Sequence, residues 1–133
     1  MKTIKYLLAA SCIIALPLSA DAQQRTGINT RPLIAQPVTG VPDKEIVIVA
    51  VDFEPGGSSG LHTHPGDEHG TVIEGTLMVR SGKDGEFKIL TVGQTFSTPP
   101  NTPNELKNTS DKPAKIINVL VLDKGKPRST PVQ

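Results

Sequence analysis

The spacing of chain breaks is the feature of this sequence that most restricts its fold. Glycine and proline, 12 of each, separate short runs of β-branched and apolar residues, and no stretch after residue 22 keeps the 3.6-residue period of an amphipathic helix. Turn residues recur about every 8 to 12 positions, which is typical of an all-β sandwich or barrel. We therefore predict an all-β chain with strands over 45–53, 68–74, 76–80, 86–92, 94–98 and 114–122.

The segments on either side of these strands are predicted to be extended. Residues 23–44 are rich in Pro, Gly and Thr and form an N-terminal arm, with one short strand around 32–35. Residues 45–122 form one barrel domain, in which the nearly continuous apolarity of 45–53 favours burial on both faces. Residues 123–133 have little apolar surface to bury, so a flexible tail is expected.

The first 22 residues have the layout of a secretory signal peptide. Lys2 and Lys5 precede an apolar run that contains Pro17, and residues 20–22 (ADA) match the small-x-small cleavage pattern. The run is too short to span a membrane. We expect cleavage after Ala22 and a periplasmic or secreted protein. Acylation of Cys12 is the alternative for the same segment.

Charge and aromatic content argue against nucleic-acid binding. Without its first 22 residues, the chain has equal numbers of basic and acidic side chains, and its only aromatic rings are Phe53, Phe87 and Phe96. Nucleic-acid surfaces are usually positive and carry stacking rings. The mature chain also has no cysteine, so neither a disulfide nor a thiol nucleophile is expected.

All three histidines of the chain lie within residues 62–69. On a strand, the two-residue spacing of His62 and His64 directs both side chains to one face, and residues 65–67 (PGD) predict a turn that returns Glu68 beside them. Two imidazoles and a carboxylate suit Zn, Fe, Mn, Ni or Cu. His69 is expected on the opposite face. A polar, His-rich hairpin without metal fits the same spacing.

The pattern around these histidines resembles the first motif of the cupin superfamily. From Gly56, five residues lead to His62, one separates it from His64, three precede Glu68, and six lead to Gly75. Every defining position of that motif is matched.

The second cupin motif is matched in part. Gly93, Pro99 and Asn108 stand at the expected positions. Asn101 replaces a glycine, a mild change because Asn tolerates left-handed turn geometry. Asn104 stands where the family's third metal-binding histidine is expected.

The resemblance covers about residues 41–122 and implies a small single-domain, conserved-barrel cupin. Such a protein has a double-stranded β-helix, or jelly-roll, barrel and is often a homodimer through exchanged N-terminal strands, here residues 23–44. It also implies a divalent metal ion held by His62, His64 and Glu68, with Asn104 in the fourth position. Asn is a weaker ligand than His, so a lower affinity for late transition metals is expected.

Three functions stay open on the sequence alone. The first is a periplasmic or secreted cupin that holds a divalent metal and binds a small polar molecule, with oxygenase or isomerase activity implied by the resemblance. The second is a metal-free barrel that binds or senses a small molecule without catalysis, which Asn104 favours. The third is an interaction protein that presents strand 45–53 to an envelope partner.

Overall fold

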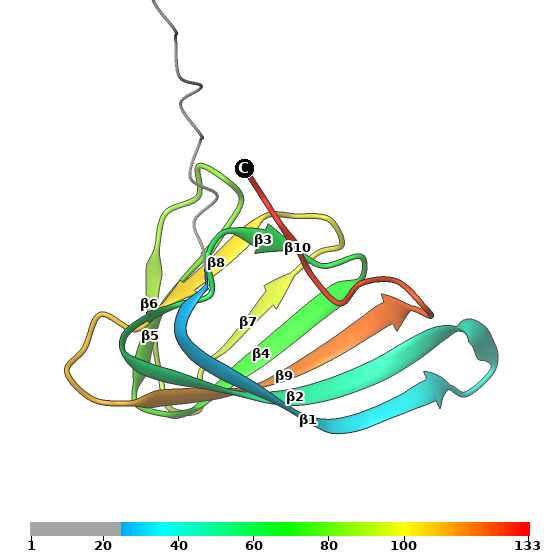
Figure 1. Cartoon of the computed structure of the whole chain (residues 1–133), viewed down its shortest axis with the longest axis horizontal. Helices are drawn as coiled ribbons and strands as arrows, with labels where there is room; N and C mark the ends of the chain where they lie inside the picture. Colours follow the sequence, from blue (N-terminus) through cyan, green and yellow to red (C-terminus); the bar gives the residue numbers. More distant parts are fainter. Residues whose placement is uncertain (1–24) are drawn as a thin grey trace, which may run out of the picture.

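Ten β-strands make up the computed structural model of the protein, which describes residues 25–133 (Figure 1). The strands are β1 (Thr26–Val38), β2 (Val41–Ser58), β3 (His62–Thr63), β4 (Asp67–Glu74), β5 (Thr76–Ser81), β6 (Lys88–Thr91), β7 (Thr95–Thr98), β8 (Asn104–Lys107), β9 (Ala114–Asp123) and β10 (Thr130–Pro131). The predicted signal peptide lies outside the described residues. No helix long and apolar enough to cross a membrane occurs in residues 25–133.

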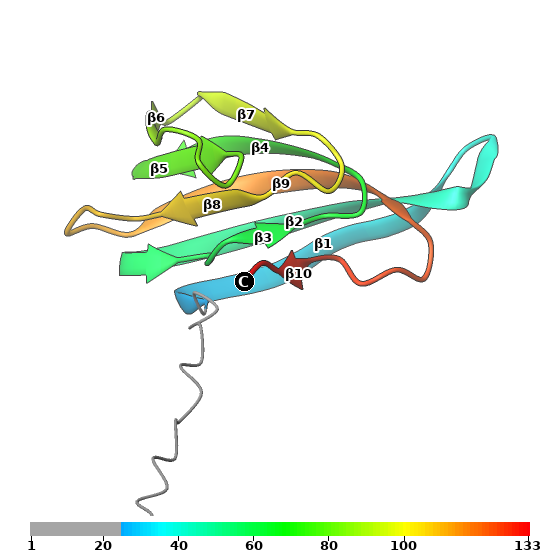
Figure 2. The same ribbon diagram turned by 90° about the horizontal axis from the view of Figure 1, so that it is seen from above.

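The strands form two curved layers that face each other (Figures 1 and 2). One layer has the order β1-β2-β9-β4-β7, and the other has the order β10-β3-β8-β5-β6. Every neighbouring pair is antiparallel, and a bridge between Ser58 of β2 and Lys107 of β8 joins the layers. This arrangement confirms the predicted all-β jelly-roll barrel.

The core lies between the layers, because alternate residues of each strand point inward. On β2 and β9 the inward positions are almost fully buried: Val47, Val49, Val51, Phe53, Ala114, Ile116, Leu120 and Leu122. Burying one such side chain larger than alanine contributes about 1.5–3 kcal/mol to folding. The outward residues Ile46 and Ile48 are only half-buried, so one chain by itself covers the inner face of β2 and leaves the outer face partly exposed.

The N-terminal arm is more regular than the sequence predicts. Instead of a short strand around 32–35, residues 26–38 form β1 and pair with β2 of the same chain. Gly40, with a φ of +79°, makes the connecting turn. β1 is an edge strand, so Pro32 and Pro37, which lack an N–H, fit within it.

The C-terminal tail also differs from its prediction, because part of it is held on the barrel. Thr130 and Pro131 pair with Thr63 and His62 of β3, and the Val132 N–H donates to the Leu61 carbonyl at 3.0 Å. Backbone pairing with β3 thus connects part of the tail to the barrel and satisfies its hydrogen-bonding groups.

Candidate metal centre

The turn between the histidines and Glu68 depends on a glycine. A Cβ atom at Gly66 would lie 1.7 Å from the carbonyl oxygen of Val121 on β9, so no other residue allows the chain to pass so close. The reversal starts β4 one residue later and points Glu68 into the barrel, where it is fully buried. The predicted turn over residues 65–67 thus brings Glu68 back to the histidines.

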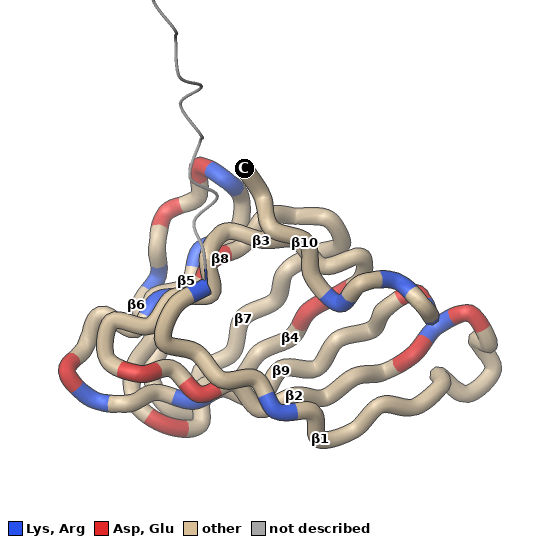
Figure 3. Tube along the Cα trace, in the orientation of Figure 1, with Lys and Arg blue, Asp and Glu red and all other residues tan. Residues whose placement is uncertain are grey.

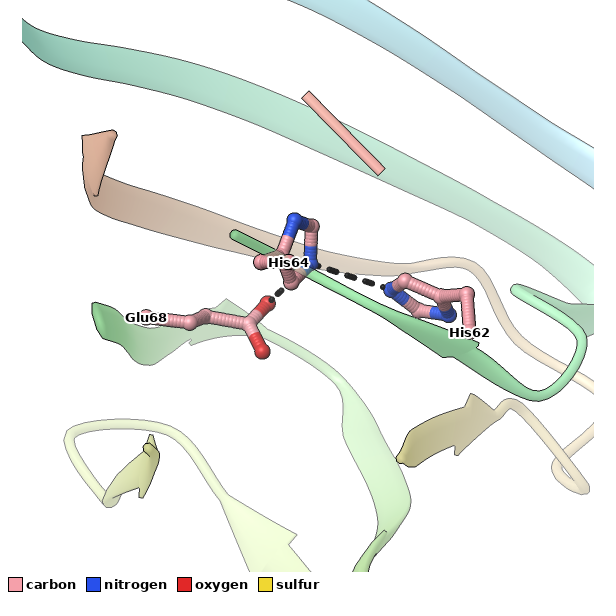
Figure 4. A group of neighbouring side chains, drawn as sticks. All are labelled: His62, His64 and Glu68. Atoms are coloured by element: carbon pink, nitrogen blue, oxygen red, sulfur yellow. Dashed lines mark hydrogen bonds and ion pairs between the residues drawn. The ribbon is translucent and has the colours of Figure 1, made fainter. Parts of the chain in front are cut away.

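The two histidines and the glutamate form one buried group (Figure 4). His62 Nε2 lies 3.1 Å from His64 Nε2, and His64 Nε2 lies 3.4 Å from Glu68 Oε1. One ligand atom from each residue lies within 4.8 Å of the others. His62 is the first residue of β3 in one layer, and Glu68 lies in β4 of the other layer, so the group spans the two layers.

Backbone carbonyls fix the tautomer of both imidazoles. His62 Nδ1 lies 2.9 Å from the Gly60 carbonyl oxygen, and His64 Nδ1 lies 2.6 Å from the Arg128 carbonyl oxygen. A carbonyl oxygen only accepts, so each Nδ1 must carry the hydrogen that it donates. Each neutral ring then has its lone pair on Nε2. Two lone pairs held this close repel unless a proton or a metal cation lies between them.

Burial and neighbouring groups set the charges of the group. Burial lowers the pKa of His62, which favours the neutral imidazole that binds metals. Burial acts to raise the pKa of Glu68, but a hydrogen bond from His64 and the charges of the two histidines, when these are protonated, hold that pKa below its usual value. Glu68 is therefore a carboxylate at neutral pH.

Asn118 of β9 orients that carboxylate from the other side. Its Nδ2 donates to Glu68 Oε1 at 2.6 Å, while Glu68 Oε2 is buried without a hydrogen-bond partner among the described residues. An unpaired buried carboxylate oxygen is costly, and a cation would relieve that cost. Sequence reasoning missed Asn118, although it is the only polar residue at an inward position of the otherwise apolar segment 114–122.

Asn104 shares a face with the histidines. It is the Cα partner of His62 in the β3–β8 pairing, and directly opposed residues of antiparallel strands project to the same side. Asn104 is fully buried, and neither its Oδ1 nor its Nδ2 has a partner within the described part of the chain. These orphaned polar atoms, the Nε2 pair and Glu68 Oε2 are chemically suited to a divalent transition metal.

The remaining residues singled out by the sequence have structural roles or lie elsewhere. Asn101 has a φ of +56°, which confirms that it adopts the left-handed geometry of the glycine that it replaces. Asn108 donates to the carbonyls of Phe53, Glu54 and Lys112 at 3.3, 3.1 and 2.8 Å. His69 is exposed on the outer side of β4, as expected from its alternation with Glu68.

The fold and this group place the chain in a known family. The cupin domain model matches residues 49–120, which is more than half of the sequence. The chain belongs to the cupin family.

Its relatives differ in what they do. A germin-like protein (subfamily 1 member 7) of Arabidopsis thaliana is 32% identical over 91 residues, 63% of this chain and 40% of the relative. The HTH-type transcriptional regulator PuuR of Escherichia coli is 29% identical over 80 residues, 59% of this chain and 42% of the relative. The chain thus spans less than half the length of these two proteins.

Among solved structures, recombinant oxalate oxidase in complex with glycolate superposes with a TM-score of 0.62. The match covers 84% of this chain and 58% of the oxidase, at 21% identity. At that identity the similarity shows a shared fold.

Proposed function

We propose that the chain is a cupin that holds a divalent transition metal through His62, His64 and Glu68 and binds a small polar molecule in the barrel. The observation that carries the proposal is the direction of the two Nε2 lone pairs. Both Nδ1 atoms donate to backbone carbonyls, an arrangement that metal-binding histidines almost always show. Asn104 would complete the set of metal ligands, either directly or through a water molecule.

The bound metal would supply Lewis-acid polarisation of an oxygen atom of the bound molecule. The protein's own contribution is to hold the ligand atoms and to exclude water with the apolar side chains of β2 and β9. Turnover as an oxygenase or isomerase is part of the proposal. It is supported by membership of the cupin family.

A metal-free binding or sensing barrel is the second candidate. The contact of 3.1 Å between the two Nε2 atoms closes a hydrogen bond when one ring carries a second proton, so the group also has a satisfied arrangement without metal. The similarity to PuuR, a transcriptional regulator, supports a sensing role for such a barrel.

Elemental mass spectrometry of protein purified without chelator distinguishes the two candidates. We expect near-stoichiometric metal in the wild type, its loss in His62→Ala, and tighter retention during dialysis in Asn104→His. His69→Ala is the matched control, because that histidine is exposed on the outer face. A wild type without metal that gains it only as Asn104→His would favour the metal-free candidate.

Export through the first 22 residues is also proposed here. The support is the basic start, the short apolar run and the ADA sequence at residues 20–22. N-terminal sequencing of protein recovered from the periplasm or medium should begin at Gln23. Protein confined to the cytoplasm with its first residues intact would contradict export.

A further inference from the structure

The cavity that the candidate metal centre lines has polar and charged residues as well as largely apolar walls. It has a volume of about 150 Å³, which is below the roughly 300 Å³ of the smallest pockets for drug-sized ligands. Apolar side chains from both layers form much of its wall, including Val49, Leu106 and Ile116. The cavity therefore suits a molecule of a few heavy atoms with a short carbon skeleton.

Two arginines from opposite ends of the chain also line this cavity. Arg25 precedes β1, and Arg128 lies between β9 and β10. In Figure 3, basic segments (blue) lie at the start of β1 and along the chain between β9 and β10. Both arginines retain exposed surface, so they lie at the cavity's entrance.

Specific contacts hold the Arg25 side chain and the Arg128 backbone in place. Arg25 Nη2 donates to Ser129 Oγ at 2.7 Å, and the Arg128 carbonyl oxygen accepts from His64 Nδ1. Pairing of Thr130 and Pro131 with β3 then secures the segment that carries Arg128. The segments that carry the two arginines are thus held beside the cavity that both arginines and the histidines line.

Neither guanidinium forms an ion pair with a carboxylate in the described part of the chain. Within residues 25–133, the ion pairs that form involve other basic groups: Lys44, His64, Arg80, Lys107 and Lys115. Burial lowers the pKa of Arg25, the nearby charge of Arg128 acts in the same direction, and the charge of Glu68 partly offsets both. Arginine guanidinium groups carry a positive charge in proteins. Glu68, the carboxylate of this cavity, already accepts a hydrogen bond from Asn118 and lies 3.4 Å from His64 Nε2.

Two cations without an ion-pair partner among the described residues, at a cavity with largely apolar walls, favour one chemical class of ligand. A guanidinium binds a carboxylate or a phosphate through paired N–H donors. The apolar walls provide contacts for carbon atoms, which inorganic phosphate lacks.

We propose that Arg25 and Arg128 bind the carboxylate of a small organic acid, whose other end faces the His62–His64–Glu68 group. This assignment rests on the proposed function, since it names the class of molecule that the barrel binds.

Calorimetric titration of the purified protein tests the assignment, with three probes: malonate, its uncharged diamide malonamide, and inorganic phosphate. Metal content is measured on each sample. We expect malonate to bind at least tenfold more tightly than either of the other probes. Arg25→Gln and Arg128→Gln should each weaken malonate binding at least tenfold while the metal content stays near that of the wild type.

Arg31→Gln is the matched control, because Arg31 is exposed on β1 opposite Ala50 and does not line the cavity. Arg25→Lys and Arg128→Lys keep the charge without the forked donor geometry, so intermediate affinity is expected. The two lysine variants also test the assignment if a glutamine variant fails to fold.

Three outcomes would overturn the assignment: malonate binding unaffected by both arginine variants, malonamide binding as tightly as malonate, or phosphate binding as tightly as malonate. With metal present, any of these leaves the proposed metal site intact. Arginine-dependent malonate binding to a protein without metal would support the assignment and contradict the metal site.

Discussion

At the scale of single residues, the candidate site depends on hydrogen-bond partners that orient the ligand atoms. The Gly60 and Arg128 carbonyls direct the two Nε2 atoms inward, and Asn118 fixes Glu68 Oε1. Gly70 makes room for this arrangement, since a Cβ there would lie 2.1 Å from the Phe96 ring and 2.5 Å from Asn118 Oδ1. A small residue on β4 therefore allows a polar residue on β9 to reach the carboxylate.

Replacing Asn118 with alanine should weaken metal binding more than it weakens the fold. The variant removes the donor to Glu68, and loss of such an orienting partner typically lowers metal affinity about 10- to 100-fold. The free energy of unfolding should fall by about 1–3 kcal/mol, because a buried hydrogen bond is lost. Competition with a chromogenic chelator and urea denaturation measure the two effects.

The matched control is Asn29→Ala, since Asn29 is exposed on β1 opposite Asp52. It should change neither quantity measurably. Equal metal affinities in Asn118→Ala and the wild type would show that Asn118 does not orient a metal ligand.

At the scale of secondary-structure elements, both ends of the described chain contribute to the site. β1 pairs with β2 at one edge of the barrel, and β10 pairs with β3, where Pro131 lies opposite His62. The segment before β10 supplies the carbonyl that bonds to His64. The tail thus has a positioning role that its composition does not indicate.

Truncation after Lys126 should lower metal affinity without unfolding the barrel. It removes β10 and the Arg128 carbonyl, which leaves His64 Nδ1 without its acceptor, while the buried core stays complete. We expect about a tenfold or greater loss of metal affinity, measured by chelator competition, with the β-sheet circular dichroism spectrum retained.

Removal of Gln133 alone is the control for this truncation, because that residue contacts only the exposed Lys83 side chain by hydrogen bond among the described residues. If the longer truncation bound metal as tightly as the full chain, the tail would have no positioning role.

At the scale of the whole molecule, the outer face of the β2–β9 sheet is apolar and incompletely covered. Ile48 lies opposite Val119, and Ile34 of β1 continues the row beside Ile48. Ile48 and Val119 are half-buried, and Ile34 is 45% exposed. A second copy of the chain would bury this row, consistent with the homodimer expected from the sequence.

We expect light scattering after size-exclusion chromatography to give the mass of a homodimer. Ile34→Lys on the arm and Ile48→Lys on β2 should each shift the protein toward monomer, because both would place a charge in the interface. Ile89→Lys is the matched control, since Ile89 is 65% exposed on β6 in the other layer. A monomeric wild type at micromolar concentration would contradict the homodimer.

Much of the fold followed from local patterns. The strands over 45–53 and 114–122 were predictable because β-branched and apolar residues run between turn signals, and both lie within observed strands, β2 and β9. β8 was not predicted, because its sequence NELK has no apolar alternation. It forms through tertiary contacts: Leu106 enters the core, while the buried Glu105 pairs with Arg80 at 2.7 Å and with Lys107 at 2.9 Å.

The candidate site likewise has a part that local sequence predicts and a part that depends on tertiary contacts. The sequence by itself determined that His62, His64 and Glu68 converge, because strand alternation and a short turn are local properties. Only the tertiary structure decided which nitrogen of each ring faces inward, and which polar residue holds the carboxylate. It also decided that Arg25 and Arg128 meet at one cavity. Those contacts join residues far apart in the chain, and no local pattern encodes them.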